Sequence, residues 1–240
     1  MKSRISPDIE LVYEQLLWIE RRRFRIVENV SAHFGRPLVD RILGSAEILA
    51  SPLSGEPEFR KLIDEREPEV FLRELALAVE KNEAAVITRL RSHVSMYREH
   101  VDEQILFGGR TAGQEAGRFF LSRTPVANVA KPRSSPLSVP ESVQAIFEMN
   151  YTGLPGERNH FVMLRSQGSS TVHFVRSPHL EAWKAAGAEP RFLYDLRCEW
   201  TKGILDIVSP QIVHSTAKSI EKGSEFGLEH FFFRGQHAGP

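Results

Sequence analysis

Apolar positions in the first half of the chain recur with the period of an α-helix. Between Asp8 and His33 they fall three to five residues apart, at Ile9, Val12, Leu16, Ile19, Phe24, Val27 and Val30. This spacing places them on one face of a long helix. The same period predicts further helices over residues 37–49, 69–81, 83–107 and 111–122. We expect Gly108 and Gly109 to end or kink the helix over 83–107.

The second half combines short strand-like runs with helical runs. Strands are predicted over residues 143–151, 160–166, 171–176, 212–220 and 226–234. Helices are predicted over 178–187 and 192–208. Together these elements predict an α+β fold, in which a helical N-terminal half packs on a C-terminal antiparallel sheet with short helices.

The change of character near residue 125 predicts three regions. Residues 1–124 are a helical region that serves in dimerisation or as a lid. Residues 125–140 are a linker, because the stretch from 131 to 140 holds three prolines and no period. Residues 141–240 are an α+β domain for ligand binding or catalysis.

Two further patterns in the first half predict structure and not chemistry. Gly109, Gly113 and Gly117 recur every four residues, and no Gly-Lys-Ser/Thr ending follows them. This predicts a helix face for close packing instead of a phosphate loop. Near the N-terminus, Arg21–Arg23 and Arg25 form a basic cluster that Glu14, Glu20 and Glu28 surround. We expect a solvated helix face with ion pairs about one turn apart.

Composition limits the classes of function. The chain has 240 residues, with 31 Lys and Arg against 31 Asp and Glu, so a net charge of zero argues against nucleic acid as a partner. One cysteine excludes an intrachain disulfide and a thiolate metal cage, and no histidine pair has metal-site spacing, so we expect neither metal nor cofactor. No apolar run approaches the roughly 18 residues of a membrane span. Without an apolar N-terminal signal segment, the expected location is cytoplasmic.

The candidate chemistry lies in the last 70 residues. Cys198 is either a nucleophile beside a base or a buried, inert cysteine. His173 and His230 lie in strand-like runs, where each is either a general base or an ordinary satisfied histidine. In the last strand, alternation sends His230 and Phe232 to one face and Glu229 and Phe231 to the other.

Residues 171–233 follow an order known from one enzyme family. A strand leads to Pro178, a short helix ends at Gly187, a longer helix carries Cys198, and a final hairpin turns at Gly223. This order resembles the L-2-amino-thiazoline-4-carboxylic acid hydrolase family and, more distantly, the V4R ligand-binding domains. The family's first and third cysteines correspond to Ser177 and Gly227 here, and its later acidic residue to Thr201.

The resemblance implies a hydrolase that acts on a C–N bond or ring of a small heterocyclic or amino-acid-derived substrate. Cys198 would be the nucleophile, with Glu199 and one of His173 or His230 as acid and base. The expected substrate-binding residues are Arg176, which would hold a carboxylate, and Ser177, Tyr194 and Trp200.

The alternative is a non-catalytic sensor or carrier of the V4R type, which binds a small molecule in the same α+β region. In both cases the helical half is expected to form a homodimer.

Overall fold

The structure is a computed structural model in which part of the chain can be described residue by residue. The described residues are 7–44, 51–53, 59, 61–63, 66–93, 97–123, 137–154, 161–165 and 168–234. The linker predicted over 125–140 lies outside them up to residue 136.

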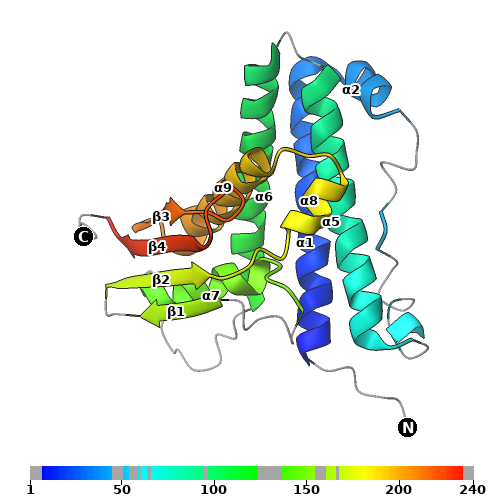
Figure 1. The fold of residues 1–240 in the computed structure, drawn as a ribbon. Coiled ribbons are helices and arrows are strands. Elements are labelled where there is room, and N and C mark those ends of the chain that lie inside the picture. The colour runs from blue at the N-terminus through cyan, green and yellow to red at the C-terminus, as the bar shows by residue number, and fades with distance from the viewer. Residues whose placement is uncertain are drawn as a thin grey trace.

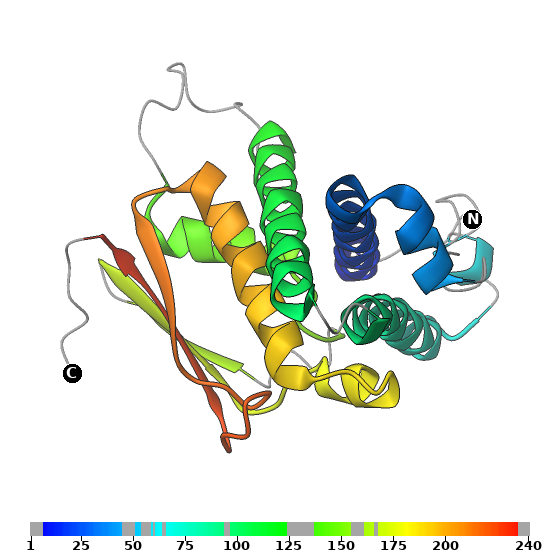
Figure 2. The same cartoon turned by 90° about the horizontal axis from the view of Figure 1, so that it is seen from above.

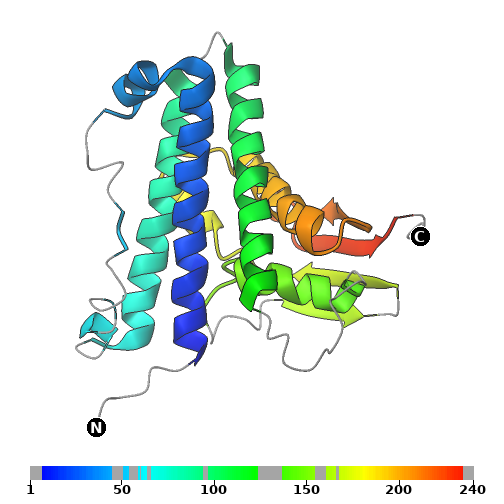
Figure 3. The ribbon, with the colours of Figure 1, turned by 180° about the vertical axis from the view of Figure 1, so that it is seen from behind.

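Three long helices, α1 (Pro7–Phe34), α5 (Pro68–His93) and α6 (Arg98–Arg123), lie side by side as a bundle (Figure 1). The short helix α2 (Arg36–Leu43) crosses one end of the bundle, where it packs on α1 and α5 (Figure 3). Helix α1 confirms the first predicted helix, over residues 8–33, to within one residue at each end.

Two predicted helix breaks are wrong. α5 continues through Asn82, and α6 continues through Gly108 and Gly109. The glycines instead allow close packing, because a Cβ on Gly108 would lie 2.9 Å from the Cα of Ile26 in α1. A glycine inside a helix costs about 1 kcal/mol relative to alanine, which close packing of this kind offsets.

The arginine cluster of α1 is only half solvated. Arg21 and Arg25 are exposed, but Arg22 and Arg23 are buried. The Nε and Nη2 atoms of Arg22 donate to the two carboxylate oxygens of Glu83 in α5, at 2.7 and 2.6 Å. The prediction of a fully solvated face is wrong because α5 packs on α1 at this level.

The predicted strand over 143–151 is also wrong, because Val139–Met149 forms helix α7. The helix begins with a capping box: the Ser138 side chain accepts from the backbone N–H of Glu141, and the Glu141 side chain accepts from the backbone N–H of Ser138. Its apolar residues Val139, Val143, Ile146 and Met149 are buried on one face. A helical period of three to four was therefore present in this segment.

The four strands are β1 (Phe161–Arg165), β2 (Ser169–Phe174), β3 (Ile212–Lys218) and β4 (Gly227–Phe233). They form one antiparallel sheet in the order β1-β2-β4-β3. Helices α8 (Leu180–Ala185) and α9 (Pro190–Val208) connect β2 to β3. The expected α+β arrangement, with a helical half beside a C-terminal antiparallel sheet, is confirmed.

Helix α9 lies between the sheet and α6 (Figure 2). Its contact with α6 is the most extensive between any two elements. A Cβ on Gly113 would lie 2.2 Å from the carbonyl oxygen of Trp200, and one on Gly203 would lie 2.1 Å from that of Arg110. The predicted packing role of the glycine face is therefore confirmed, and the close approach fixes how far α9 stands from the bundle.

Candidate functional site

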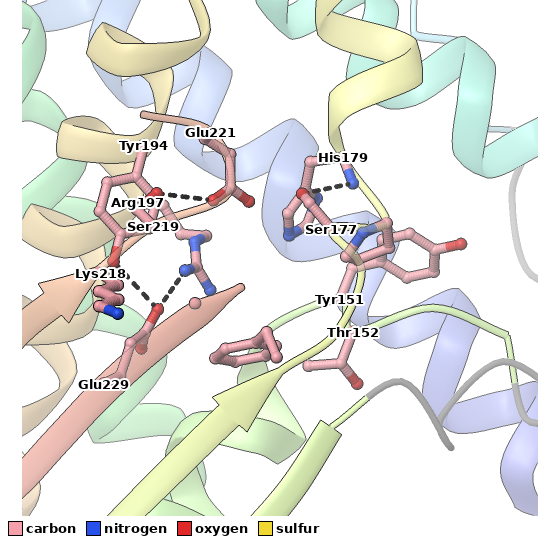
Figure 4. Close-up of a pocket in the computed structure, with 13 residues that line it drawn as sticks. Tyr151, Thr152, Ser177, His179, Tyr194, Arg197, Lys218, Ser219, Glu221 and Glu229 are labelled. Atoms are coloured by element: carbon pink, nitrogen blue, oxygen red, sulfur yellow. Dashed lines mark hydrogen bonds and ion pairs between the residues drawn. The ribbon is translucent and has the colours of Figure 1, made fainter. Parts of the chain in front are cut away.

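A polar recess opens between α9, the start of β4 and three connecting segments, which follow α7, β2 and β3 (Figure 4). It encloses about 320 Å³ of empty space, part of it open to solvent. Its polar lining residues are Tyr151, Thr152, Ser177, His179, Tyr194, Arg197, Lys218, Ser219, Glu221 and Glu229. We call it the outer recess.

A buried ion pair forms one wall of the outer recess. Nη2 of Arg197 in α9 donates to Oε1 of Glu229 in β4. Oε2 of the same carboxylate lies 3.1 Å from Nε2 of His214. The hydroxyl of Tyr194 lies 3.3 Å from Oε1 and 3.0 Å from Oγ1 of Thr216. These contacts hold the guanidinium in one place in the wall of the recess.

The electrostatics of this wall follow from burial and from the Arg197 charge. Burial alone would raise the pKa of Glu229, but Arg197 and the bond with His214 lower it to about 2. Burial and the neighbouring Glu229 charge raise the pKa of Tyr194. Near neutral pH the wall therefore presents an ionised Glu229 and a neutral Tyr194 hydroxyl.

A second carboxylate lies on the other side of Arg197 (Figure 4). The turn after β3 carries Glu221, whose Oε2 accepts from the hydroxyl of Ser219 at 2.8 Å. Burial opposes ionisation of Glu221, but the Arg197 charge keeps its pKa below the ordinary value. Lys218 lies at the rim, with Nζ 4.2 Å from the ring centroid of Phe226.

The opposite wall is built around His179. Its Nδ1 contacts Oε1 of Glu80 from α5, and both side chains are buried. The imidazole stacks on Trp183 with ring centroids 5.2 Å apart, and the ring of Tyr151 approaches it edge-on. The bundle helix α5 thus fixes a side chain that lines the recess.

A second space adjoins the first, and three residues, Tyr151, His179 and Arg197, line both. It spans about 290 Å³ of empty space, part of it open to solvent, and the other residues that line it are Ile19, Arg22, Met149, Asn150, Trp183 and Trp200. All nine except Arg197 are buried. We call it the inner recess.

The expected substrate-binding residues are partly brought together. Ser177 and Tyr194 line the outer recess, and Trp200 lines the inner one. Arg176 is exposed and lines neither of them.

The expected catalytic residues are not brought together. Val172 and Glu229 are paired in register and are buried against the helices. Because side chains alternate along a strand, His173 and His230 point to the opposite, outer face of the sheet. There His230 Nδ1 lies 3.0 Å from Oγ1 of Thr171, and His173 lies edge-on to Phe226. Neither histidine can therefore act as a base for Cys198, which lies on α9 against the inner face.

Glu199 points toward α6 and not toward either recess. Its Oε1 accepts from Nζ of Lys202 at 2.5 Å, and its Oε2 lies 3.5 Å from Nη1 of Arg110.

Cys198 is half-buried and also lines neither recess. Its Sγ lies 3.9 Å from Oγ1 of Thr216. Burial, and then the Glu229 charge, raise the pKa of the Cys198 thiol to about 11. This environment suppresses the thiolate that a nucleophile needs.

Sequence reasoning missed three residues that organise the recess: Arg197, Glu229 and His179. A signal for Glu229 was present, since alternation placed this carboxylate on the same face as Phe231. A charge on an apolar face requires a buried partner. That partner, Arg197, lies 32 residues away, and nothing in the local pattern identifies it.

We expect the folded protein to react slowly with iodoacetamide at pH 7. With a thiol pKa of about 11 against an ordinary value near 8.5, the thiolate fraction of Cys198 falls on the order of 300-fold. Mass spectrometry of alkylated protein over time measures the rate. Protein unfolded in urea is the control and should react at the ordinary rate. Equal rates in both states would contradict the environment described here.

No protein-family model matches the chain, and no curated protein matches it. The resemblance of residues 171–233 to the thiazoline hydrolases therefore stays a prediction that depends on those residues alone.

Within the described stretches, no helix is long and apolar enough to cross a membrane. The same stretches hold no group of three or more His, Cys, Asp or Glu side chains able to bind a metal ion. Fold and site together define an α+β protein with two adjoining recesses.

Proposed function

We propose that the chain is a small-molecule-binding protein that acts as a sensor or carrier, with the two recesses as its binding site. One observation carries this proposal. Polar groups of the recess walls, Arg197 above all, are fixed by buried ion pairs before any ligand arrives. Fixed polar groups in a concave, largely buried space are typical of small-molecule sites. Such groups lose little conformational freedom on binding.

The cysteine-dependent hydrolysis of a C–N bond is the second candidate. It is favoured by the position of Cys198, which lies on the same helix as Arg197 and one turn from Tyr194. It has less support, because the pKa of the thiol is raised and the expected bases, His173 and His230, lie on the other face of the sheet. His214 lies on the inner face, but its Nε2 is engaged by Glu229. We further propose a cytoplasmic homodimer that associates through the helical half, where Phe24 of α1 and Phe107 of α6 are exposed.

Blocking the outer recess should abolish binding. A thermal-shift screen of small metabolites would first identify a compound that raises the melting temperature saturably. Thr152 lines the recess and is only partly buried, so in the Thr152→Trp variant the indole fills the opening. We expect its dissociation constant for that compound, measured by calorimetry, to rise at least about tenfold because the two groups compete for the same space.

The matched control is Ser215→Trp, which adds the same side chain at an exposed position of β3. It should bind the compound as the wild type does. The proposal is wrong if the screen yields no saturable ligand, or if Thr152→Trp binds the compound unchanged.

A further inference from the structure

The outer face of the sheet has no second layer of the described chain upon it. Helices α7 and α9 contact the strands from one side, and every described helix lies on that side (Figure 2). The inner side chains Val172, Ile212 and Phe231 are buried against these helices. The side chains that alternate with them along the strands point away from the helices. Within the described chain, one broad surface of the molecule is therefore formed by a sheet face alone.

Apolar side chains spread across this outer face. Strand pairing places four of them there: Leu164 of β1, Val213 of β3, and Leu228 and Phe232 of β4. Leu164 is 64 % exposed, and the other three are half-buried. Phe232 and Val213 are directly paired across β4 and β3. Contiguous apolar surface of this kind marks an interaction site.

The polar side chains of the outer face contact one another or an aromatic ring. Nδ1 of His230 lies 3.0 Å from Oγ1 of Thr171 in the neighbouring strand. His173 lies edge-on to Phe226, and Nζ of Lys218 lies 4.2 Å from the centroid of the same ring. A contact with apolar surface would therefore leave these pairs in place.

The charge of the outer face favours a second copy of the chain as its occupant. Its strand positions hold Lys218 at the end of an edge strand and no Asp, Glu or Arg. An anionic lipid surface is typically bound by a cluster of four to eight basic side chains, which one lysine does not supply. A partner selected by charge would find nothing complementary. A second copy presents the same face, with no like charges at its centre to repel.

The size of the outer face sets the strength of such a contact. Four strands about 4.8 Å apart and about six residues long cover roughly 400 Å². A standard interface buries about 800 Å² on each partner. Two sheets pack face to face through their side chains at a separation of about 10 Å. The contact is therefore a weak one that forms and dissociates with protein concentration.

We propose that two copies of the chain associate reversibly through the outer faces of their sheets. The contact is isologous, so the apolar side chains of one protomer pack on the same side chains of its partner. It is separate from the helical contact proposed above, because α9 lies between the sheet and α6 (Figure 2). It is also independent of the small-molecule site, which lies on the inner side of the sheet.

The experiment is sedimentation velocity of the full-length protein over a series of concentrations. Phe107→Glu is the starting variant, since Phe107 is 60 % exposed on α6 and its replacement removes the helical contact. We expect Phe107→Glu to remain a concentration-dependent dimer. Adding Leu164→Glu should raise its dissociation constant at least about tenfold, because a carboxylate would then be buried against an apolar surface.

Ser215→Glu provides a second test at the opposite edge of the sheet. Ser215 is exposed and is paired with His230, which is in turn paired with Thr171 and, through it, with Leu164. Added to Phe107→Glu, it should weaken the dimer as Leu164→Glu does. Both positions are exposed, so the variants should fold, and circular dichroism checks that they do.

Three results would overturn the proposal. Phe107→Glu could be monomeric at every concentration, which would leave the helical contact alone. The dissociation constant could stay unchanged in both sheet variants, which would place the contact elsewhere. A monomeric protein could instead sediment with phosphatidylserine vesicles and lose this binding in Leu164→Glu, which would assign the face to a lipid surface. None of these results bears on the recesses, which the screen and Thr152→Trp test separately.

Discussion

Alanine at Gly113 or Gly203 is expected to destabilise the protein by about 3 kcal/mol or more, at the upper end of the cost of overpacking a core. In both cases the added methyl group would lie within 2.2 Å of a backbone oxygen of the facing helix. A backbone oxygen cannot rotate away, so α6 and α9 must separate along their whole crossing. Urea denaturation followed by circular dichroism measures the loss.

Gly109→Ala is the matched control, since Gly109 belongs to the same glycine face of α6. Its added methyl group would meet one side-chain tip, Cδ1 of Leu196 at 2.3 Å, and the next contact is at 3.5 Å. Leu196 can change rotamer, and alanine gains about 1 kcal/mol of helix propensity over glycine. We expect stability within about 1 kcal/mol of wild type. Equal losses in all three variants would show that backbone approach is not the cause.

The glycine face shows how far the sequence predicts this fold. The repeat at positions 109, 113 and 117 predicts a close helix contact, but the partner residue Trp200 lies 87 positions after Gly113. For α7 the local sequence does carry a helix signal, the capping box of Ser138 and Glu141, although a strand was predicted there. The burial of Arg22 was not readable at all, because its partner Glu83 is 61 residues away.

The candidate site is likewise predicted from the sequence only where local patterns determine it. Tyr194 and Ser177 were expected in the site and line the outer recess. The predicted alternation along β4 is confirmed, with Glu229 and His230 on opposite faces. Which face α9 covers depends on packing between distant segments, and for this reason His230 was assigned to the site while Glu229 was not. Long-range pairs such as His179 with Glu80, 99 residues apart, have no local signature.

Arg197→Met should destabilise the folded protein by about 3–5 kcal/mol near neutral pH, the usual cost of leaving a buried charge unpaired. Methionine preserves most of the side-chain volume but removes the charge that faces Glu229. Adding Glu229→Gln to this variant should recover part of the loss, because it removes the buried carboxylate that Arg197 had paired with. The control is Arg191→Met, an exposed position at the start of the same helix, which should stay within about 0.5 kcal/mol of wild type.

The pH dependence distinguishes this electrostatic cause from a loss of packing. In the wild type the pKa of Glu229 is about 2, against an ordinary value near 4.3, so the ionised group contributes about 3 kcal/mol above pH 5. That contribution is lost as the pH falls from 5 toward 2. Without Arg197, burial dominates and the pKa of Glu229 rises above the ordinary value, so acid instead favours the folded variant. Urea denaturation between pH 3 and 7 should therefore show the gap between wild type and Arg197→Met narrowing toward low pH. A gap that stays constant across this range would mean that Arg197 stabilises the fold by packing alone.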